Sequence, residues 1–301
     1  MKTTTEGLHS TSVGLDTLPA PEVLRRLLAA QLEALATVGT ALAGLDAGAE
    51  LMTSAINGGG RIAYAGAGSS ALMANADGAE LPGTFGIPAG RVSLNMAGGI
   101  PTDAHMPGDT EDDLEDGKRA GNAFGDGDVV IAVSASGRTP YVIGFAQAAR
   151  SNGAKIIAIA NNAAAKIFTH ADVEICLPTP PEIVAGSTRM GAATAQKVAL
   201  NMMSTLMGIR LGQIHDGMMV GLIADNDKLR ARAANMVAEI AGVDATLASQ
   251  GLKSAGGAVK PAVLISCGAS PDDATQILAK ANGNLRAALA LLRTTEPACK
   301  S

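Results

Sequence analysis

The sequence has few aromatic residues, few cysteines and no excess of positive charge. Its 301 residues include no tryptophan, and phenylalanine and tyrosine together make up 2% of the chain. The core must therefore be built from aliphatic residues and methionine, and with 36 glycines this favours helices packed closely on a sheet. A formal net charge of −5 argues against a nucleic-acid surface, which needs clustered lysine and arginine.

The cysteine count and the hydropathy pattern indicate the cellular compartment in which we expect the protein. Cys176, Cys267 and Cys299 are an odd number without metal-ligand spacing, which is typical of reduced thiols in a cytosolic protein. The first residues contain no apolar signal-peptide core, and no uninterrupted apolar run reaches the roughly 18 residues of a membrane span. We therefore expect a soluble cytoplasmic protein with no membrane partner.

One stretch, residues 129–141, shows a pattern typical of anion-binding sites. A β-branched run at 129–133 predicts a buried strand, and helical spacing begins after Pro140. Between them lie Ser134, Ser136, Gly137 and Thr139. A hydroxyl-rich glycine turn between a strand and a helix directs backbone N–H groups and the positive helix end at an anion, although a turn of this kind can also be a simple connection.

Two similar turns occur elsewhere. A strand at 61–64 leads through Gly66 and Gly68 to Ser69 and Ser70, and residues 185–189, with Ser187 and Thr188, precede a long apolar helix at 190–211. The first of these lacks the third glycine and the acidic residue of a dinucleotide-binding motif. No metal-binding spacing is present either, so we expect no cofactor.

The order of elements predicts an α/β fold with a doubly wound, mostly parallel sheet flanked by helices. Predicted strands at 61–64, 91–96, 129–133, 155–160 and 173–177 alternate with helices. Ligands of such sheets bind at the carboxyl ends of the strands, where the three turns would converge. We expect an N-terminal arm at 1–20, a main domain at 21–220 and a helical C-terminal domain at 221–301. The last contains two related units with a 26-residue offset, as between Gly257 and Gly283.

Two glutamates occupy positions suited to acid–base chemistry. Glu80 precedes Leu81-Pro82-Gly83, which we expect to end a helix, and the negative helix end would disfavour its ionisation. Glu111 follows a predicted N-cap at Thr110, in the first turn of a helix at 114–125, where the carboxylate is favoured. An acid and a base with opposed tendencies suit proton transfer, but Glu111 could equally be an ordinary cap.

Taken together, these residues resemble the N-acetylmuramic acid 6-phosphate etherase family within the sugar-isomerase (SIS) phosphosugar-binding superfamily. The resemblance covers nearly the whole chain, and its strongest parts are Ser134–Gly144 and Gly186–Arg189 with Thr194–Lys197. It implies a lyase that eliminates D-lactate from a 6-phosphorylated muramic sugar, gives N-acetylglucosamine 6-phosphate and serves cell-wall recycling. It also implies that Glu80 is the acid, that Glu111 is the base, and that homodimers share active sites. The phosphate would be held by Ser69, Ser70, Ser134, Ser136, Gly137, Thr139, Ser187 and Thr188.

The chain departs from the family pattern at three places. In the N-terminal arm, Leu8 and His9 stand where the family has an arginine and an asparagine. Leu72 stands where the family has an arginine, and His105 stands where it has a lysine, so His105 becomes a candidate substrate contact. With these changes, the resemblance does not specify which substituents the substrate sugar carries. Two other hypotheses remain, a non-catalytic phosphosugar-binding regulator and an aldose–ketose sugar phosphate isomerase.

Overall fold

The chain forms two compact units. The computed structural model describes residues 4–222, 224 and 227–295. The first unit comprises Met1–Ala79 and Gly90–Leu206, and the second comprises Glu80–Ala89 and Met207–Ser301.

The first unit is built on a five-stranded sheet with the order β2-β1-β3-β4-β5, and every neighbouring pair is parallel. Gly66 at the end of one central strand lies opposite Met96 on one side and Val133 on the other. All five strands lie where the sequence predicts them, because short, mostly apolar runs alternating with helices mark the strands of a parallel sheet. The strands are β1 (Ile62–Gly66), β2 (Val92–Met96), β3 (Val129–Ser134), β4 (Lys155–Ala160) and β5 (Val173–Cys176).

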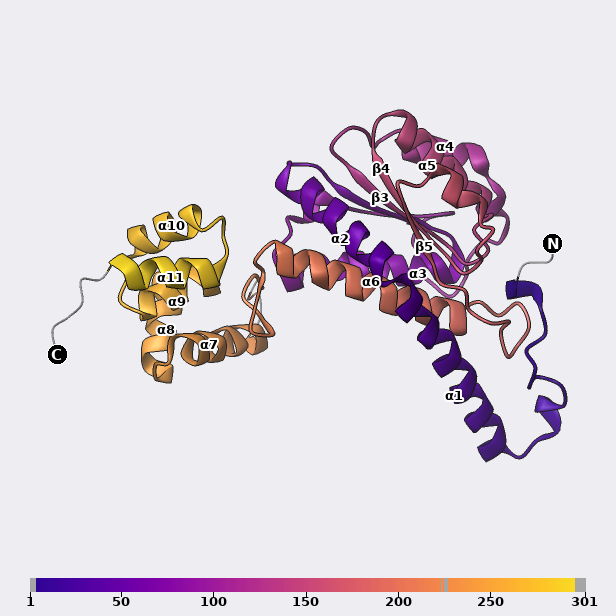
Figure 1. Ribbon diagram of the computed structural model, residues 1–301, viewed down its shortest axis with the longest axis horizontal. Helices are drawn as coiled ribbons and strands as arrows, with labels where there is room; N and C mark the ends of the chain where they lie inside the picture. The colour runs from indigo at the N-terminus through magenta and orange to yellow at the C-terminus, as the bar shows by residue number, and fades with distance from the viewer. Residues whose placement is uncertain (1–3, 223, 225–226, 296–301) are drawn as a thin grey trace. The chain divides into compact units, whose positions relative to one another are not determined.

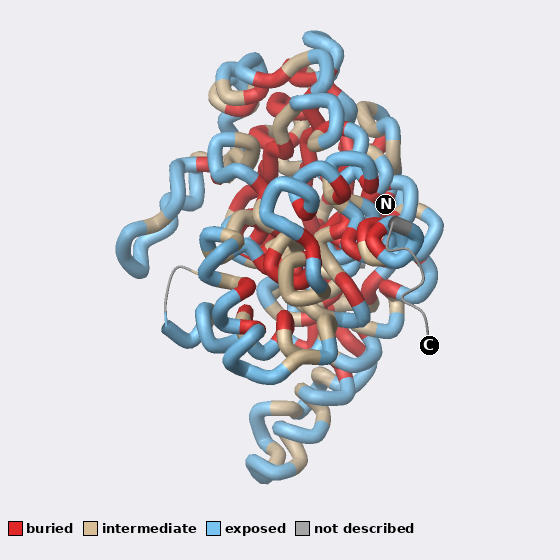
Figure 2. Tube along the Cα trace, turned by 90° about the vertical axis from the view of Figure 1, so that its left-hand side faces the viewer, coloured by how far each residue is buried: buried red, intermediate tan, exposed pale blue. Residues whose placement is uncertain are grey.

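Helices cover both faces of this sheet, which confirms the doubly wound α/β fold (Figure 1). On one face lie α4 (Leu114–Gly121) and α5 (Pro140–Ser151), where Phe145 packs among buried residues of β3 and β4. On the other lie α2 (Leu42–Asn57), α3 (Gly68–Phe85) and α6 (Gly191–Arg210). Every residue of β1 and β3 is buried, and Figure 2 shows the buried residues in red. Short 3-10 turns connect these elements at Ala89–Arg91, Asp109–Asp112 and Lys166–His170.

Helix α1 (Ala20–Ala36) is joined to α2 by a 3-10 turn at Thr37–Ala41. By length and composition alone, the helical stretch Ala20–Asn57 is apolar enough to cross a membrane, and 17% of its most apolar window is buried. Its second half nevertheless belongs to the core of this unit, since Ala49 and Met52 on α2 are fully buried.

The N-terminal arm packs against α1. It contains two 3-10 turns, Thr4–Glu6 and Leu15–Thr17. The backbone N–H of Thr11 donates to Nδ1 of His9, so the proton on Nε2 faces Glu33, 3.4 Å away on α1. Arg26 donates to the carbonyl of Thr11 at 3.0 Å, which fixes the arm at a second point.

The second unit is helical apart from a two-stranded ribbon. Its ribbon strands are β6 (Ile214–His215) and β7 (Met218–Met219), and its helices are α7 (Asp227–Ala241), α8 (Ala245–Ser254), α9 (Val259–Ser266), α10 (Pro271–Lys280) and α11 (Leu285–Thr295). The pair α10–α11 repeats α8–α9 at the offset of 26 residues. Asp244 and Ser270, at equivalent positions, each cap a helix with a side-chain oxygen.

Candidate functional site

The site is organised by a change in chain direction at the centre of the sheet. From β1 the chain moves outward to β2, then returns past β1 to β3 and continues to β5. In open parallel sheets, the loops that leave adjacent strands in opposite directions create a crevice at their carboxyl ends. Gly66 and Val133 are paired neighbours, so the loops after β1 and β3 begin about 5 Å apart across this crevice.

The loop after β3 gathers the hydroxyl groups that the sequence predicts. Oγ of buried Ser134 lies 2.8 Å from Oγ1 of Thr139 and 3.5 Å from Oγ of Ser136. The backbone N–H groups of Gly137 and Arg138 donate to Ser134 Oγ and Ser136 Oγ, respectively. Thr139 is the N-cap of α5, but no side-chain bond caps this helix. The loop thus presents hydroxyls and a helix N-terminus together, which suits a phosphate group.

This loop is held tightly and requires glycine at one position. Gly137 has φ = +65°, and a Cβ there would lie 2.1 Å from Cβ of Ala165. Its carbonyl accepts the N–H of Ile167 at 3.0 Å, which joins the loop to the 3-10 turn after β4. The hydroxyl loop is therefore a pre-formed feature of the fold.

The loop after β1 is shorter than predicted, because α3 begins at Gly68. Ser69 and Ser70 therefore lie in the first turn of α3, where Ser70 is buried and Ser69 is half-buried. Leu72 follows on the same helix and is half-buried.

A cavity of about 230 Å³ opens at the carboxyl ends of β1 and β2. Glu111 and His105 both line it, so the structure brings two of the predicted site residues together. Its remaining lining residues are Ala67, Gly68, Met96, Ala97, Gly98, Gly99, Pro101, Met106, Pro107, Gly108 and Thr110. Glu111 and His105 are the titratable side chains of this lining, and the rest is mostly apolar or glycine, as is usual for a small-ligand site.

The local structure around Glu111 differs from the prediction. Asp109–Asp112 form a 3-10 turn, and the N-cap of α4 is Asp113, whose carboxylate accepts the N–H of Asp116 at 2.8 Å. Thr110 instead donates to the carbonyl of Pro107. The prediction that Glu111 lies in the first turn of an α-helix is therefore wrong, because Asp113 is the better-placed cap. As a result, Glu111 faces the cavity from a turn that precedes α4.

Glu80 does not lie at a helix end, which corrects a second prediction. Helix α3 continues through Pro82 to Phe85 and is ended by Gly86, which has φ = +66° and donates to the carbonyl of Pro82 at 3.0 Å. A glycine in this conformation is a favoured helix terminus, whereas a proline near the end removes only one hydrogen bond. Glu80 is not among the residues that line the cavity.

The third hydroxyl-containing turn, at residues 185–189, differs most from the predicted anion site. Ser187 and Thr188 lie on the loop between β5 and α6, both half-buried. The N-terminus of α6 is occupied by the chain itself, because Glu182 accepts the N–H groups of Gly191 and Ala192, both at 2.9 Å. Sequence reasoning missed Glu182, since a glutamate nine residues before a helix is not a recognisable cap.

A buried polar network, which sequence reasoning also missed, joins α3, α6 and β1. Asp77 is 4% exposed and accepts hydrogen bonds from Tyr64, Asn201 and Ser204. Burial, and then the Asp77 carboxylate, raise the pKa of Tyr64 well above its usual value, so its hydroxyl stays a donor. The sequence signal that could have revealed this network is an aspartate inside an apolar helix. Within the part of the chain that the structure describes, no group of three or more potential metal ligands occurs.

Comparison with known proteins gives the family context. Residues 111–206 match the SIS domain family. The chain is 38% identical over 288 residues to an N-acetylmuramic acid 6-phosphate etherase of Deinococcus radiodurans, covering 95% of this chain and 94% of the relative. It is 36% identical to the etherase of Mycolicibacterium smegmatis, covering 95% and 97%. Among solved structures, a Bacteroides fragilis protein described as a phosphosugar isomerase involved in capsule formation shares the fold, with a TM-score of 0.50 and 19% identity over 64% of this chain and 91% of that one.

Proposed function

The chain belongs to the N-acetylmuramic acid 6-phosphate etherase family, and we propose that Glu111 and Glu80 perform the proton transfers of its reaction. The protein is a carbon–oxygen lyase that cleaves the lactyl ether of N-acetylmuramic acid 6-phosphate, a reaction of cell-wall sugar recycling. The observation that supports our assignment most directly is that Glu111 lines the cavity at the carboxyl end of β1, the strand that pairs with β3, which leads into the hydroxyl loop.

The proposed mechanism starts from the open-chain sugar, whose aldehyde acidifies the proton on carbon 2. The Glu111 carboxylate removes this proton, a double bond forms between carbons 2 and 3, and the bond from carbon 3 to the lactyl oxygen breaks. Glu80 protonates the departing oxygen and, now a carboxylate, takes a proton from the water whose oxygen adds at carbon 3. Glu111 returns its proton to carbon 2 as the double bond is lost, so both carboxyl groups end in their starting states. The two carboxyl groups thus act as general base and general acid.

The phosphate is the part of the substrate that positions the reacting carbons without reacting itself. We assign it to the turn formed by Ser134, Ser136, Gly137 and Thr139, with Ser69, Ser70, Ser187 and Thr188 as further contacts. His105 would contact the sugar, since it lines the same cavity as Glu111. Anchoring a remote group in this way converts binding energy into orientation of the reacting atoms.

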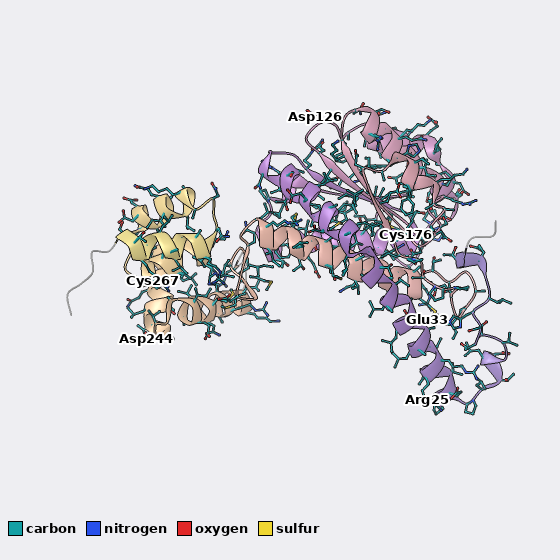
Figure 3. The ribbon with its side chains drawn as sticks, viewed as in Figure 1. Arg25, Glu33, Asp126, Cys176, Asp244 and Cys267 are labelled. Carbon is teal, nitrogen blue, oxygen red and sulfur yellow. The ribbon has the colours of Figure 1, made fainter. Side chains whose placement is uncertain are left out.

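We further propose that the enzyme is a cytoplasmic homodimer with shared active sites. Leu24, Leu28 and Leu32 recur every four residues along α1 and are 65%, 61% and 57% exposed. Helix α1 extends from the body of the first unit (Figure 1), and Arg25 and Glu33 lie on this helix (Figure 3). An exposed apolar stripe is typical of an interaction surface. A second copy would cover it, and one copy's Glu80 would meet the cavity of the other.

The domain boundaries remain part of this proposal. We assign the reaction to residues 21–220, with residues 1–20 as an arm and residues 221–301 as a helical domain. The arm supports this division because it packs on α1 as a separate segment, through Arg26 and His9.

Mixing two inactive variants tests both the residue roles and the shared site. Glu80→Gln and Glu111→Gln are each expected to release no D-lactate from N-acetylmuramic acid 6-phosphate. If the site is shared, mixed dimers contain one site with both glutamates, and an equal mixture regains about a quarter of the wild-type rate. If both glutamates act within one chain, the mixture stays inactive. Size-exclusion chromatography with light scattering on wild type and Leu28→Glu shows whether the wild type is a dimer and whether the leucine stripe forms its interface. Flotation with lipid vesicles shows whether the stripe binds a membrane instead.

Hydrogen exchange at carbon 2 distinguishes the individual roles. In D₂O, Glu111→Gln should show no deuterium uptake at carbon 2, whereas Glu80→Gln should retain some uptake without releasing lactate. Equal loss in both variants would contradict the assignment of Glu80 as the acid. Exchange without lactate in the wild type would favour an isomerase, and binding without exchange would favour a regulator.

A further inference from the structure

Glu182 is a buried carboxylate to which the proposed reaction gives no role. It is 5% exposed, and its two oxygens each accept a backbone N–H, Oε2 from Gly191 and Oε1 from Ala192, both at 2.9 Å. These are the first two residues of α6, a helix of 20 residues. The positive end of a long helix and two charge-assisted hydrogen bonds compensate the cost of burying the charge.

This contact closes the N-terminus of α6 to other anions. Two of its N–H groups already have an acceptor, and a phosphate brought to the same place would meet the negative charge of Glu182. The N-terminus of α5 differs, because Thr139 caps it without a side-chain bond and neutral hydroxyls surround it. Of these two helix ends, only that of α5 is available to the substrate phosphate.

The same contact fixes the loop that carries Ser187 and Thr188. Residues 183–190 run from Glu182 to the residue before its hydrogen-bond partner Gly191, so the two ends of the loop are tied together. Inside it, the N–H of Ser187 donates to the carbonyl of Val184 at 2.9 Å, and the N–H of Met190 donates to that of Ser187 at 3.1 Å. Val184 is 49% exposed. The loop tip is therefore open to solvent while its base is buried.

We propose that Glu182 is a positioning residue that ties the base of this loop to α6, so that Ser187 and Thr188 are presented to the substrate. It also keeps the N-terminus of α6 free of phosphate. This inference rests on the proposed function, in which the 183–190 loop contacts the substrate. Glu182 itself touches neither the sugar nor the phosphate, and its effect passes through the loop.

The first test compares Glu182→Gln with Asp244→Asn in the full-length protein. Asp244 is a matched control, because it also accepts two helix N–H groups, from Thr246 and Leu247, but it caps α8 in the second unit. A glutamine can accept only one of the two N–H groups, which releases one end of the loop. We expect Glu182→Gln to raise KM about tenfold with kcat changed less than about threefold, and Asp244→Asn to leave both constants unchanged. A lower melting temperature with unchanged KM would make Glu182 a structural cap only and overturn the proposal.

The second test uses the wild type and does not depend on activity. Amide hydrogen exchange is measured with and without inorganic phosphate as the probe. We expect Gly191 and Ala192 to be protected equally in both conditions, and residues 137–139 to gain protection with phosphate. Phosphate-dependent protection at Gly191 and Ala192 would overturn the proposal, even if Glu182→Gln does not fold. Because this readout requires no lactate release, failure of the etherase assignment would be seen separately.

Discussion

The side-chain amide of Asn201 on α6 donates to Oδ1 of Asp77 on α3 at 2.6 Å. Ser204 donates to the same oxygen at 2.8 Å, and the hydroxyl of Tyr64 on β1 donates to Oδ2 at 2.7 Å. One buried carboxylate thus joins two helices and a central strand. Because α3 carries Glu80 three residues later, the network also holds the helix that bears the proposed acid.

We expect Asp77→Ala to lower the free energy of unfolding by about 3 kcal/mol or more, because three buried donors lose their acceptor together. Tyr64→Phe is the matched variant, since it removes one donor and leaves the other two bonds; its cost should be about 1–2 kcal/mol. Urea denaturation followed by circular dichroism measures both. Equal losses would show that the carboxylate does not act as the centre of the network.

Helices α4 and α5 pack unusually closely, and this contact links the two parts of the site. A Cβ on Gly117 would lie 2.0 Å from the carbonyl oxygen of Tyr141, and one on Gly144 would lie 2.2 Å from that of Leu114. Helix α4 follows the turn of Glu111, and α5 follows the hydroxyl loop. The glycines therefore set the distance between the proposed base and the phosphate site.

Gly117→Ala should force α4 away from α5, destabilise the protein by about 1–3 kcal/mol and reduce lactate release through displacement of Glu111. Gly90→Ala is the control, because a Cβ there meets nothing within 4 Å and should change stability by less than about 0.5 kcal/mol. Thermal denaturation and the lactate assay are run on both variants. A Gly117→Ala protein as stable and active as Gly90→Ala would contradict the close-packing argument.

The sheet and its hydroxyl loop could be predicted from the sequence because their signals are local. Buried parallel strands are nearly continuous apolar runs, and Ser134 and Gly137 come directly after the β-branched run of β3. The end of α3 could not be located in the same way. Pro82 is a local signal for a helix end, but the helix ends only where Gly86 adopts a left-handed conformation.

The contacts that are distant in sequence could not be predicted. Asp77 and Asn201 are 124 residues apart, and Glu182 meets Gly191 only because the intervening loop turns back. The pairing of His105 with Glu111 in one cavity depends on the chain between them, which has no regular periodicity. Their roles in the reaction remain predictions for the experiments described above.

Lys260 should make the free energy of unfolding rise with pH, whereas a lysine in a surface ion pair makes it fall as pH rises. On α9, its Nζ donates to the carbonyl of Gly283 at 2.9 Å, and burial lowers its pKa to about 8 from the 10.5 of a free lysine. Between these two pH values the unfolded chain holds a proton that the folded chain has released. The free energy of unfolding should therefore rise with pH in this window, with a slope below the roughly 1.4 kcal/mol per pH unit of one full proton.

Lys260→Met should remove the contribution of Lys260 to the rise of unfolding free energy with pH, because methionine carries no titratable proton. Lys280→Met on α10 serves as the control, since Lys280 is exposed and the same number of lysines is lost. Urea denaturation of the three proteins at several pH values between about 8 and 10.5 gives the slopes. The prediction requires that wild type and Lys280→Met share a slope that Lys260→Met lacks. Three parallel curves would mean that Lys260 titrates as it does in the unfolded chain, and that its burial imposes no cost on the charged form.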